Sequence, residues 1–263
     1  MFAYAAAILL TFADGLGVQL VTQPVILERL QAGMVPGRER QTVIAKLFTD
    51  SGCQVELHKF DGHFSNVICR LPGDTDETIV VGGHTDFIDA GKGIVDDWSG
   101  SSLLPSLYQS LKLLEHRKHT YEFVAFTAEE RGLVGSTRYV KELSPERRGT
   151  IKAFINLECV GLTTPKVWVR RSTPLLVDLF GKIANATQTP VQGVNVDNVG
   201  DDDTHPFLDK KMRVICIHSV TQETIRILHS NRDNLSAINP ADYYATYRLV
   251  AFYLEYLDTK LTQ

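Results

Sequence analysis

The sequence lacks any block of lysine or arginine residues and any apolar run long enough to cross a membrane. Its 263 residues carry a formal net charge of −4, which gives no electrostatic basis for binding nucleic acid or an anionic membrane. The apolar start MFAYAAAILLTF is too short to span a bilayer. We therefore expect neither a nucleic-acid partner nor an integral membrane span.

Cysteine is also scarce. The four cysteines are widely spaced and contain no C-x-x-C pair, a pattern that fits neither a structural zinc site nor a disulfide scaffold. Cys53 and Cys69 flank an expected turn at Asp61 and Gly62, so a hairpin would bring them near each other. We favour the interpretation that all four are buried free thiols.

The N-terminal part of the chain has no lysine or arginine before Arg29, although a secretory signal normally begins with a basic region. Its apolar core and the small residues near Ala13 resemble such a signal, and an apolar helix is the alternative. We predict an apolar segment over residues 1–20 and one domain over 21–263. The segment favours an extracytoplasmic location, secreted or periplasmic.

Predicted strands alternate with predicted helices along the chain. Residues 24–51 have helical apolar spacing with a break at Pro36 and Gly37, and QVELHKF and SNVICRL predict a hairpin. The apolar runs TIVVGG, YEFVAFTA, KAFINLE, KVWVR and RVICIHS predict strands. Further helices are expected over 99–114 with Ser99 as N-cap, 135–143, 174–187, 205–211 and 240–257.

This alternation predicts a three-layer α/β/α sandwich around a mixed, largely parallel central sheet. The chain is long enough for one large domain, and it contains no internal repeat, low-complexity tract or linker. In such sheets, ligands bind beyond the carboxyl ends of the strands. His84, the pair Glu129 and Glu130, and Glu158 each follow a predicted strand, so we expect them to meet at one crevice.

Two further metal-binding side chains lie in turns: Asp96 in GIVDDWSG and His229 in ILHSNRDN. Zinc takes histidine nitrogen and carboxylate oxygen ligands. Two histidines and three carboxylates, one of them shared, can hold two zinc ions with a bridging water. One more carboxylate must stay off the metals to accept a proton from that water, and the Glu129–Glu130 pair provides it.

The ordered motifs HTD, VDDWSG, AEERGLVGS, NLE and HSNRDN resemble those of the co-catalytic zinc aminopeptidases. This metallopeptidase family also includes carboxypeptidase Q and, more distantly, the glutaminyl cyclases. The resemblance runs from about residue 38 to 258. It implies a zinc-dependent exopeptidase, an aminopeptidase acting on a peptide substrate, with two Zn²⁺ ions.

The resemblance also implies the metal ligands. Asp96 would bridge the two ions, and the remaining ligands would be His84 and Glu158 on one ion and Glu130 and His229 on the other. The position of Glu158 is often Asp in the family, and glutamate has a longer reach.

Supporting roles follow from the same resemblance. Glu129 would be the general base. Asp86 would accept the ring N–H of His84 and fix its tautomer, and Asp233 would support His229 in the same way.

The segment DDDTHPF resembles the loop that lines the substrate pocket in the family. This maps Asp203 to the pocket and leaves Asp201 and Asp202 as solvated charges. Trp98 either walls the site or lies in the core beneath it. Asp97 would be a supporting or capping acid, unless it exchanges roles with Asp96.

Only two of the eight histidines are assigned to metals. His218 competes with His229, but only His229 begins an H-S-x-x-D-N pattern in a loop before a helix. His205 either points into the pocket or serves packing and helix capping. The other four, in a hairpin or a charged helix end, are expected at the surface: His58, His63, His116 and His119.

Two other functions remain open. A glutaminyl-cyclase-like transferase would hold one zinc ion with Asp, Glu and His ligands, although VDDWSG and AEERGLVGS resemble the hydrolytic branch more. A non-enzymatic interaction domain is disfavoured by the complete set of ligands. With no large insertion that suggests a dimerisation domain, a monomer is the default expectation.

Overall fold

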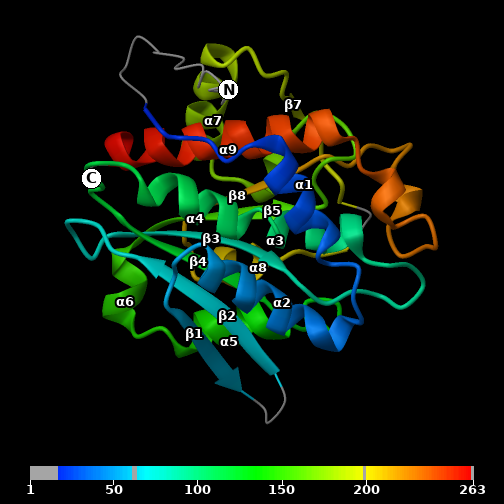
Figure 1. Ribbon diagram of the computed structural model, residues 1–263. Coiled ribbons are helices and arrows are strands. Elements are labelled where there is room, and N and C mark those ends of the chain that lie inside the picture. The colour runs from blue at the N-terminus through cyan, green and yellow to red at the C-terminus, as the bar shows by residue number, and fades with distance from the viewer. Residues whose placement is uncertain (1–16, 61–63, 198–199, 262–263) are drawn as a thin grey trace, which may run out of the picture.

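A mixed sheet of eight strands lies at the centre of the molecule, in the order β1-β2-β4-β3-β5-β8-β6-β7 (Figure 1). The computed structural model describes residues 17–60, 64–197 and 200–261. The strands are β1 (Val55–Phe60), β2 (Phe64–Leu71), β3 (Thr78–His84), β4 (Thr120–Phe126), β5 (Ile151–Glu158), β6 (Lys166–Val167), β7 (Gln192–Gly193) and β8 (Val214–His218).

The central strands β4, β3, β5 and β8 run parallel to one another, whereas β2 and β6 are antiparallel to their central neighbours. The expected mixed, largely parallel sheet is therefore confirmed. Every residue of β3 and β4 is buried, as expected for parallel strands that are covered on both faces.

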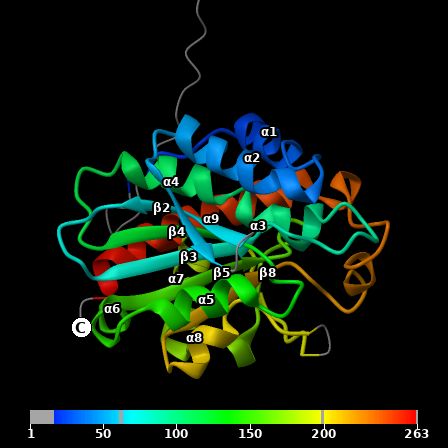
Figure 2. The same cartoon turned by 90° about the horizontal axis from the view of Figure 1, so that it is seen from below.

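Helices cover both faces of this sheet and complete the three layers (Figure 2). One face carries α1 (Gln23–Gln31), α2 (Gly37–Asp50), α4 (Leu104–Lys112) and α9 (Pro240–Lys260), with α7 (Pro174–Ala186) packed against α9. The other face carries α5 (Val134–Glu142), α6 (Pro145–Thr150) and α8 (His205–Asp209). Within the described ranges, no helix is both long and apolar enough to traverse a bilayer.

The helix expected over 99–114 is interrupted. A π-helical turn (Ile94–Trp98) leads into the short α3 (Ser99–Ser101), and α4 begins only at Leu104. Ser99 lies inside this segment and is not the predicted N-cap. Its hydroxyl donates to the Val95 carbonyl at 2.7 Å and accepts the Val160 N–H at 2.9 Å, so it joins the segment to the chain after β5.

Gly83, the residue before His84, occupies a position near the end of β3 where there is no room for a side chain. A Cβ atom at Gly83 would lie 2.8 Å from the Asp97 carboxylate and 3.0 Å from the Ser101 nitrogen. These distances are too short for a side chain. The glycine therefore lets the segment that contains Asp96 and Asp97 approach the end of β3.

A disulfide joins Cys53 and Cys69, so the free thiols predicted at these two positions are wrong. Strand pairing places Val55 opposite Cys69, which brings the chain just before β1 against β2. The expected turn over residues 61–63, His63 included, lies outside the described residues. Cys159 and Cys216 are free and buried, as predicted.

His119 is fully buried, which contradicts the predicted surface position. Its Nδ1 lies 3.1 Å from an Asp258 carboxylate oxygen, and this carboxylate also accepts the backbone N–H of His119 at 2.8 Å. The apolar start of the chain, residues 1–16, lies outside the described residues. From Gly17 the chain is held to α9, because the Glu255 carboxylate accepts the N–H groups of Gly17 and Val18.

Candidate metal centre

Three predicted ligands form a first cluster at the carboxyl ends of β3 and β5. His84 ends β3 and Glu158 ends β5, and these parallel neighbours place His84 Nε2 3.4 Å from Glu158 Oε1. Asp96 enters from the π-helical turn, with Oδ1 3.2 Å from the same nitrogen. The three donor atoms lie within 4.8 Å of one another.

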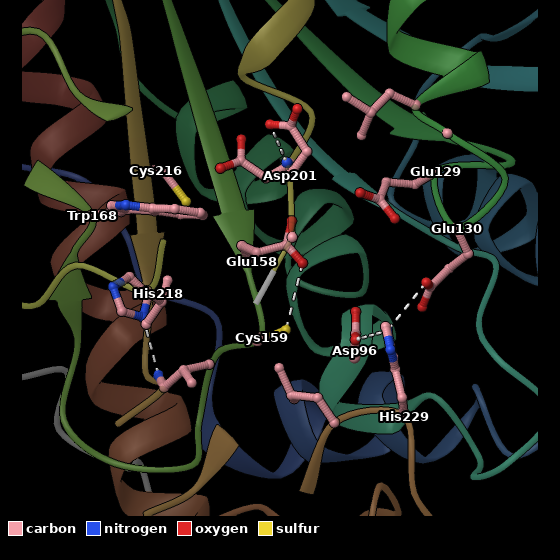
Figure 3. A pocket seen from close by; sticks show the side chains of 17 residues that line it. Asp96, Glu129, Glu130, Glu158, Cys159, Trp168, Asp201, Cys216, His218 and His229 are labelled. Carbon is pink, nitrogen blue, oxygen red and sulfur yellow. Dashed lines mark hydrogen bonds and ion pairs between the residues drawn. The ribbon is translucent and has the colours of Figure 1, made fainter. Parts of the chain in front are cut away.

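A second cluster uses the other oxygen of Asp96. Asp96 Oδ2 lies 3.1 Å from His229 Nε2, and the same nitrogen lies 3.2 Å from Glu130 Oε2. His229 comes from the loop after a short 3-10 helix (Ile225–Ile227), and its φ of +52° is in the left-handed region. Figure 3 shows Asp96 and Glu130 beside the His229 ring. Each oxygen of Asp96 thus belongs to a different cluster.

The two clusters fit metal ions. Ligands about 2.0–2.2 Å from a tetrahedral zinc ion lie roughly 3.3 Å from one another, and the separations between histidine nitrogens and carboxylate oxygens here are 3.1–3.4 Å. Glu130 Oε1 is buried and has no hydrogen-bond partner among the described residues. A buried carboxylate oxygen without a donor is costly, and a cation would compensate for it.

The charges of the site are also suited to a cation. Burial by itself lowers the pKa of His84, but the carboxylates of Glu129 and Glu158 raise it well above its ordinary value. The hydrogen bond to Asp96 raises the pKa of His229 to about 9. Burial raises the pKa of Glu130 to about 7. Without a cation the site therefore retains protons, which a metal ion would displace.

Glu129 lies beside the clusters and belongs to neither. Its Oε2 is 3.8 Å from His84 Nε2, and burial raises its pKa to about 10. A bound cation reverses such a shift, so Glu129 would be ionised and free to accept a proton when metal is present. This is the arrangement expected for the predicted base beside the predicted ligand Glu130.

Asp86 connects His84 to the acidic pair. The His84 Nδ1–H donates to the backbone carbonyl of Asp86 at 3.1 Å, while the Asp86 carboxylate lies 3.7 Å away. That carboxylate instead accepts the backbone N–H groups of Glu129 at 3.0 Å and Glu130 at 3.1 Å. Asp86 therefore fixes the His84 tautomer through its main chain, and its side chain holds the Glu129–Glu130 turn.

Two more acids support the ligands through hydrogen bonds to the main chain. Asp97 accepts the backbone N–H groups of His84 at 3.1 Å and Cys159 at 2.8 Å. These bonds connect the ends of β3 and β5, so Asp97 is the supporting acid that the sequence indicated. Asp233 accepts the N–H of Asp96 at 3.3 Å and that of the preceding residue at 2.7 Å. It therefore supports Asp96 and not, as predicted, His229.

Arg40 is a supporting residue that sequence analysis missed. Its side chain is fully buried, and its guanidinium donates to the carbonyls of Gly33, Thr85, Lys92 and Gly93 at 2.5–3.3 Å. Burial lowers its pKa to about 10. The available signal is its spacing, because Arg40 shares one face of α2 with the buried Ile44 and Phe48. Its acceptors are main-chain atoms, which the sequence does not reveal.

A cavity of about 230 Å³ opens over the metal centre. Figure 3 shows Glu130 and His229 on one side of it and Trp168, Cys216 and His218 on the other. The apolar part of the lining comes from residues that no sequence pattern indicated: Leu133, Trp168, Val196, Val220 and Leu228.

Trp98 is not among the lining residues, so it does not wall the substrate pocket and the alternative place in the core is the one observed. It is fully buried, and its indole N–H donates to the Leu30 carbonyl at 2.9 Å. His218 lines the cavity but lies outside both ligand clusters. Its Nε2–H donates to the Val194 carbonyl at 3.0 Å, and burial lowers its pKa to about 4.

Two of the three aspartates of DDDTHPF differ from the prediction, whereas Asp201 is exposed as predicted. Asp203 is fully buried and does not line the cavity, and burial raises its pKa to about 8. Asp202 is buried and not solvated, and it accepts the Thr204 N–H at 2.6 Å. Asp201 lines the cavity and is paired with Arg171 and His205.

Comparison with known proteins agrees with this site. The sequence model of one family, described as peptidase family M28, matches residues 66–254, which include all five candidate ligands. The chain belongs to peptidase family M28. The family resemblance seen in the motifs is thereby confirmed.

One M28 relative is a probable leucine aminopeptidase 2 of Aspergillus fumigatus, 33% identical over 151 residues. The match covers 57% of this chain and 27% of that protein, so the chain spans about a quarter of the relative's length.

Two solved structures share the fold. The LapA aminopeptidase of Legionella pneumophila has a TM-score of 0.81 at 17% identity, over 91% of this chain and 73% of that one. A glutaminyl cyclase of an Acidobacteriales bacterium has a TM-score of 0.78 at 17% identity, over 93% and 97% of the two chains. These likenesses confirm the α/β fold of the M28 chain.

Proposed function

We propose that this M28 protein is a zinc-dependent aminopeptidase that removes the N-terminal residue of a peptide and holds two zinc ions. The observation that supports this most directly is the division of Asp96 between two ligand clusters, each completed by one histidine and one glutamate. Glu129 lies beside the clusters without belonging to them. A set of five ligands and a separate acid is more than a single ion requires.

The residues of the chain define the reaction. Zinc ions held by His84, Asp96 and Glu158 and by Asp96, Glu130 and His229 would acidify a water molecule and polarise the scissile carbonyl. Glu129 accepts a proton from the attacking water and returns it to the leaving amine. The carboxylates around the cavity favour a positively charged α-amine at the substrate's N-terminus.

Asp86 keeps this arrangement in place. Its carboxylate holds the main chain of Glu129 and Glu130 while its carbonyl orients the His84 ring. Such partners of metal ligands commonly change metal affinity or activity by about 10–100-fold when they are replaced.

The location that we propose is extracytoplasmic, secreted or periplasmic. Disulfides persist in oxidising compartments and are rare in the cytosol. The Cys53–Cys69 disulfide supports this proposal together with the apolar start of the sequence. We further propose that the protein is a monomer.

Hydrolysis of leucine 4-nitroanilide by the purified protein tests the activity. We expect a chelator to abolish hydrolysis and zinc to restore it, and we expect metal analysis to find two ions per chain. Glu129→Gln should bind zinc like the wild type and lose about three orders of magnitude in kcat, because general base catalysis contributes about 10²–10⁴-fold. Full activity of Glu129→Gln would contradict the mechanism.

A glutaminyl cyclase is the second candidate, because the solved cyclase matches this chain over 97% of its own length. A peptide with N-terminal glutamine, assayed beside the nitroanilide, separates the two functions. Ammonia release, one zinc ion per chain and an intact nitroanilide would support the cyclase. Purified protein that takes up no zinc would indicate an interaction domain instead.

A further inference from the structure

A second cavity lies next to the metal centre, between α5 and α8. Its volume is about 390 Å³, and it shares Leu133 and Asp201 with the cavity over the metal centre. The remaining lining residues are Thr137, Val140 and Lys141 from α5 and His205, Pro206, Asp209 and Lys210 from α8 and its end. The two cavities therefore adjoin at Leu133 and Asp201.

The charges of the second cavity are positive in sum. Asp201 pairs with Arg171 and also contacts the His205 ring, and Asp209 lies 3.5 Å from His205 Nε2. With Arg171 included, three cations stand against these two acids. In contrast, Lys141 and Lys210 have no ion-pair partner within the described ranges. Two ammonium groups at the rim of a partly apolar cavity favour an anionic ligand with an apolar part.

The length of α5 sets the distance to the lysines. Lys141 follows Leu133 by eight positions, which corresponds to a rise of about 12 Å along the helix. An extended peptide advances roughly 3.3 Å per residue, so about four residues span that distance. A C-terminal carboxylate about four residues beyond Leu133 would therefore reach the lysines.

We propose that the second cavity binds the C-terminal end of short peptide substrates, with Lys141 and Lys210 holding the terminal carboxylate. Val140 and Pro206 would contact the side chain of the last residue. This inference rests on the proposed aminopeptidase function and makes the protein a peptidase for peptides of about four residues with a free C-terminus. Longer and amidated peptides would lose the contact to the lysines.

Steady-state kinetics with Leu-Gly-Gly-Leu and its C-terminal amide test the proposal. We expect the wild type to have a KM about tenfold lower for the acid than for the amide, since exposed ion pairs contribute up to about 1 kcal/mol each. Lys141→Glu/Lys210→Glu should raise the KM of the acid at least tenfold with kcat unchanged. Leucine 4-nitroanilide, which is too short to reach the lysines, should be hydrolysed as by the wild type.

Lys46→Glu/Lys59→Glu is the matched control, because it makes the same change of net charge at exposed positions of α2 and β1. It should retain the preference for the acid. Equal KM values for acid and amide in the wild type, or an unchanged preference in the Lys141/Lys210 variant, would overturn the inference. If either result occurs while leucine 4-nitroanilide is hydrolysed normally, the aminopeptidase function is still supported. A wild type that is inactive on all three substrates contradicts that function.

Discussion

Replacement of Arg40 by methionine tests how the metal centre is held together. The guanidinium donates to four main-chain carbonyls, in a turn after α1 and in the loops that follow His84 and precede Asp96. It also lies over the rings of Phe87 and Trp98, at 4.3 and 5.3 Å from their centroids. Methionine fills much of the same space and removes every donor.

The expected loss follows from these contacts. The Gly93 carbonyl keeps the Trp98 N–H at 3.2 Å, but the other three carbonyls lose their donor. A buried carbonyl left without a donor costs about 1 kcal/mol, so three carbonyls cost about 3 kcal/mol in the free energy of unfolding. Methionine also avoids the cost of burying a charge, which offsets part of this loss. We expect a net destabilisation of about 1–3 kcal/mol, which lowers Tm by roughly 3–10 °C.

The zinc affinity should fall as well, because Thr85 and Gly93 are held by Arg40 and adjoin the segments of His84 and Asp96. We expect a loss of about 10–100-fold, as for other residues that orient metal ligands. Thermal unfolding and zinc titration of the metal-free protein measure the two effects. Arg40→Lys, which keeps the charge with fewer donors, should lie between the wild type and Arg40→Met.

The reasoning would be refuted if Arg40→Met unfolded within 1 °C of the wild type and bound zinc with the same affinity. The four carbonyls would then have adequate donors without the guanidinium. A loss of stability with unchanged zinc affinity would restrict Arg40 to a role in the fold.

Three further predictions concern protons and the disulfide. Because the hydrogen bond to Asp96 raises the pKa of His229 to about 9, zinc uptake at pH 7 must release a proton. The zinc affinity should therefore rise between pH 7 and 9, and calorimetry in two buffers of different ionisation enthalpy should detect the released proton. A pH-independent zinc affinity would be inconsistent with this. Cys53→Ala/Cys69→Ala opens a loop of 16 residues, and its free energy of unfolding in urea should fall by about 3 kcal/mol. Reduction of the wild type should have the same effect, and an unchanged urea midpoint would contradict a disulfide in solution. Burial raises the pKa of Asp258, but its hydrogen bonds with His119 lower that pKa below the ordinary value. Asp258 therefore contributes stability above about pH 4 that is lost as the pH falls further. Asp258→Asn should show a smaller difference in urea midpoint between pH 6 and pH 3 than the wild type, and an equal difference would argue against this role.

Much of the site could be predicted because adjacent parallel strands place the side chains that follow them at the same edge of the sheet. His84 and Glu158 end adjacent parallel strands, so their proximity follows from two apolar runs and the direction of the chain. Glu129 and Glu130 follow β4 in the same way.

The errors arose where side chains bind main-chain atoms, either in distant segments or in the same loop. The family resemblance assigned Asp233 to His229, but the Asp233 carboxylate accepts the N–H of Asp96. Asp202 was expected in solvent because it lies in a run of acids, yet it is buried and accepts a local N–H group. Trp98 stands beside the ligand turn in sequence, and its indole points into the core instead.

The amino-acid sequence alone determined the α/β layers and the five candidate ligands, because apolar periodicity and residue chemistry are local properties that do not depend on the rest of the chain. The tertiary structure decided which oxygen of Asp96 faces which histidine, that Cys53 meets Cys69, and that a buried Arg40 holds the loops around the site. These features depend on distances between residues far apart in the chain, and such distances are set only when the loops pack against the sheet.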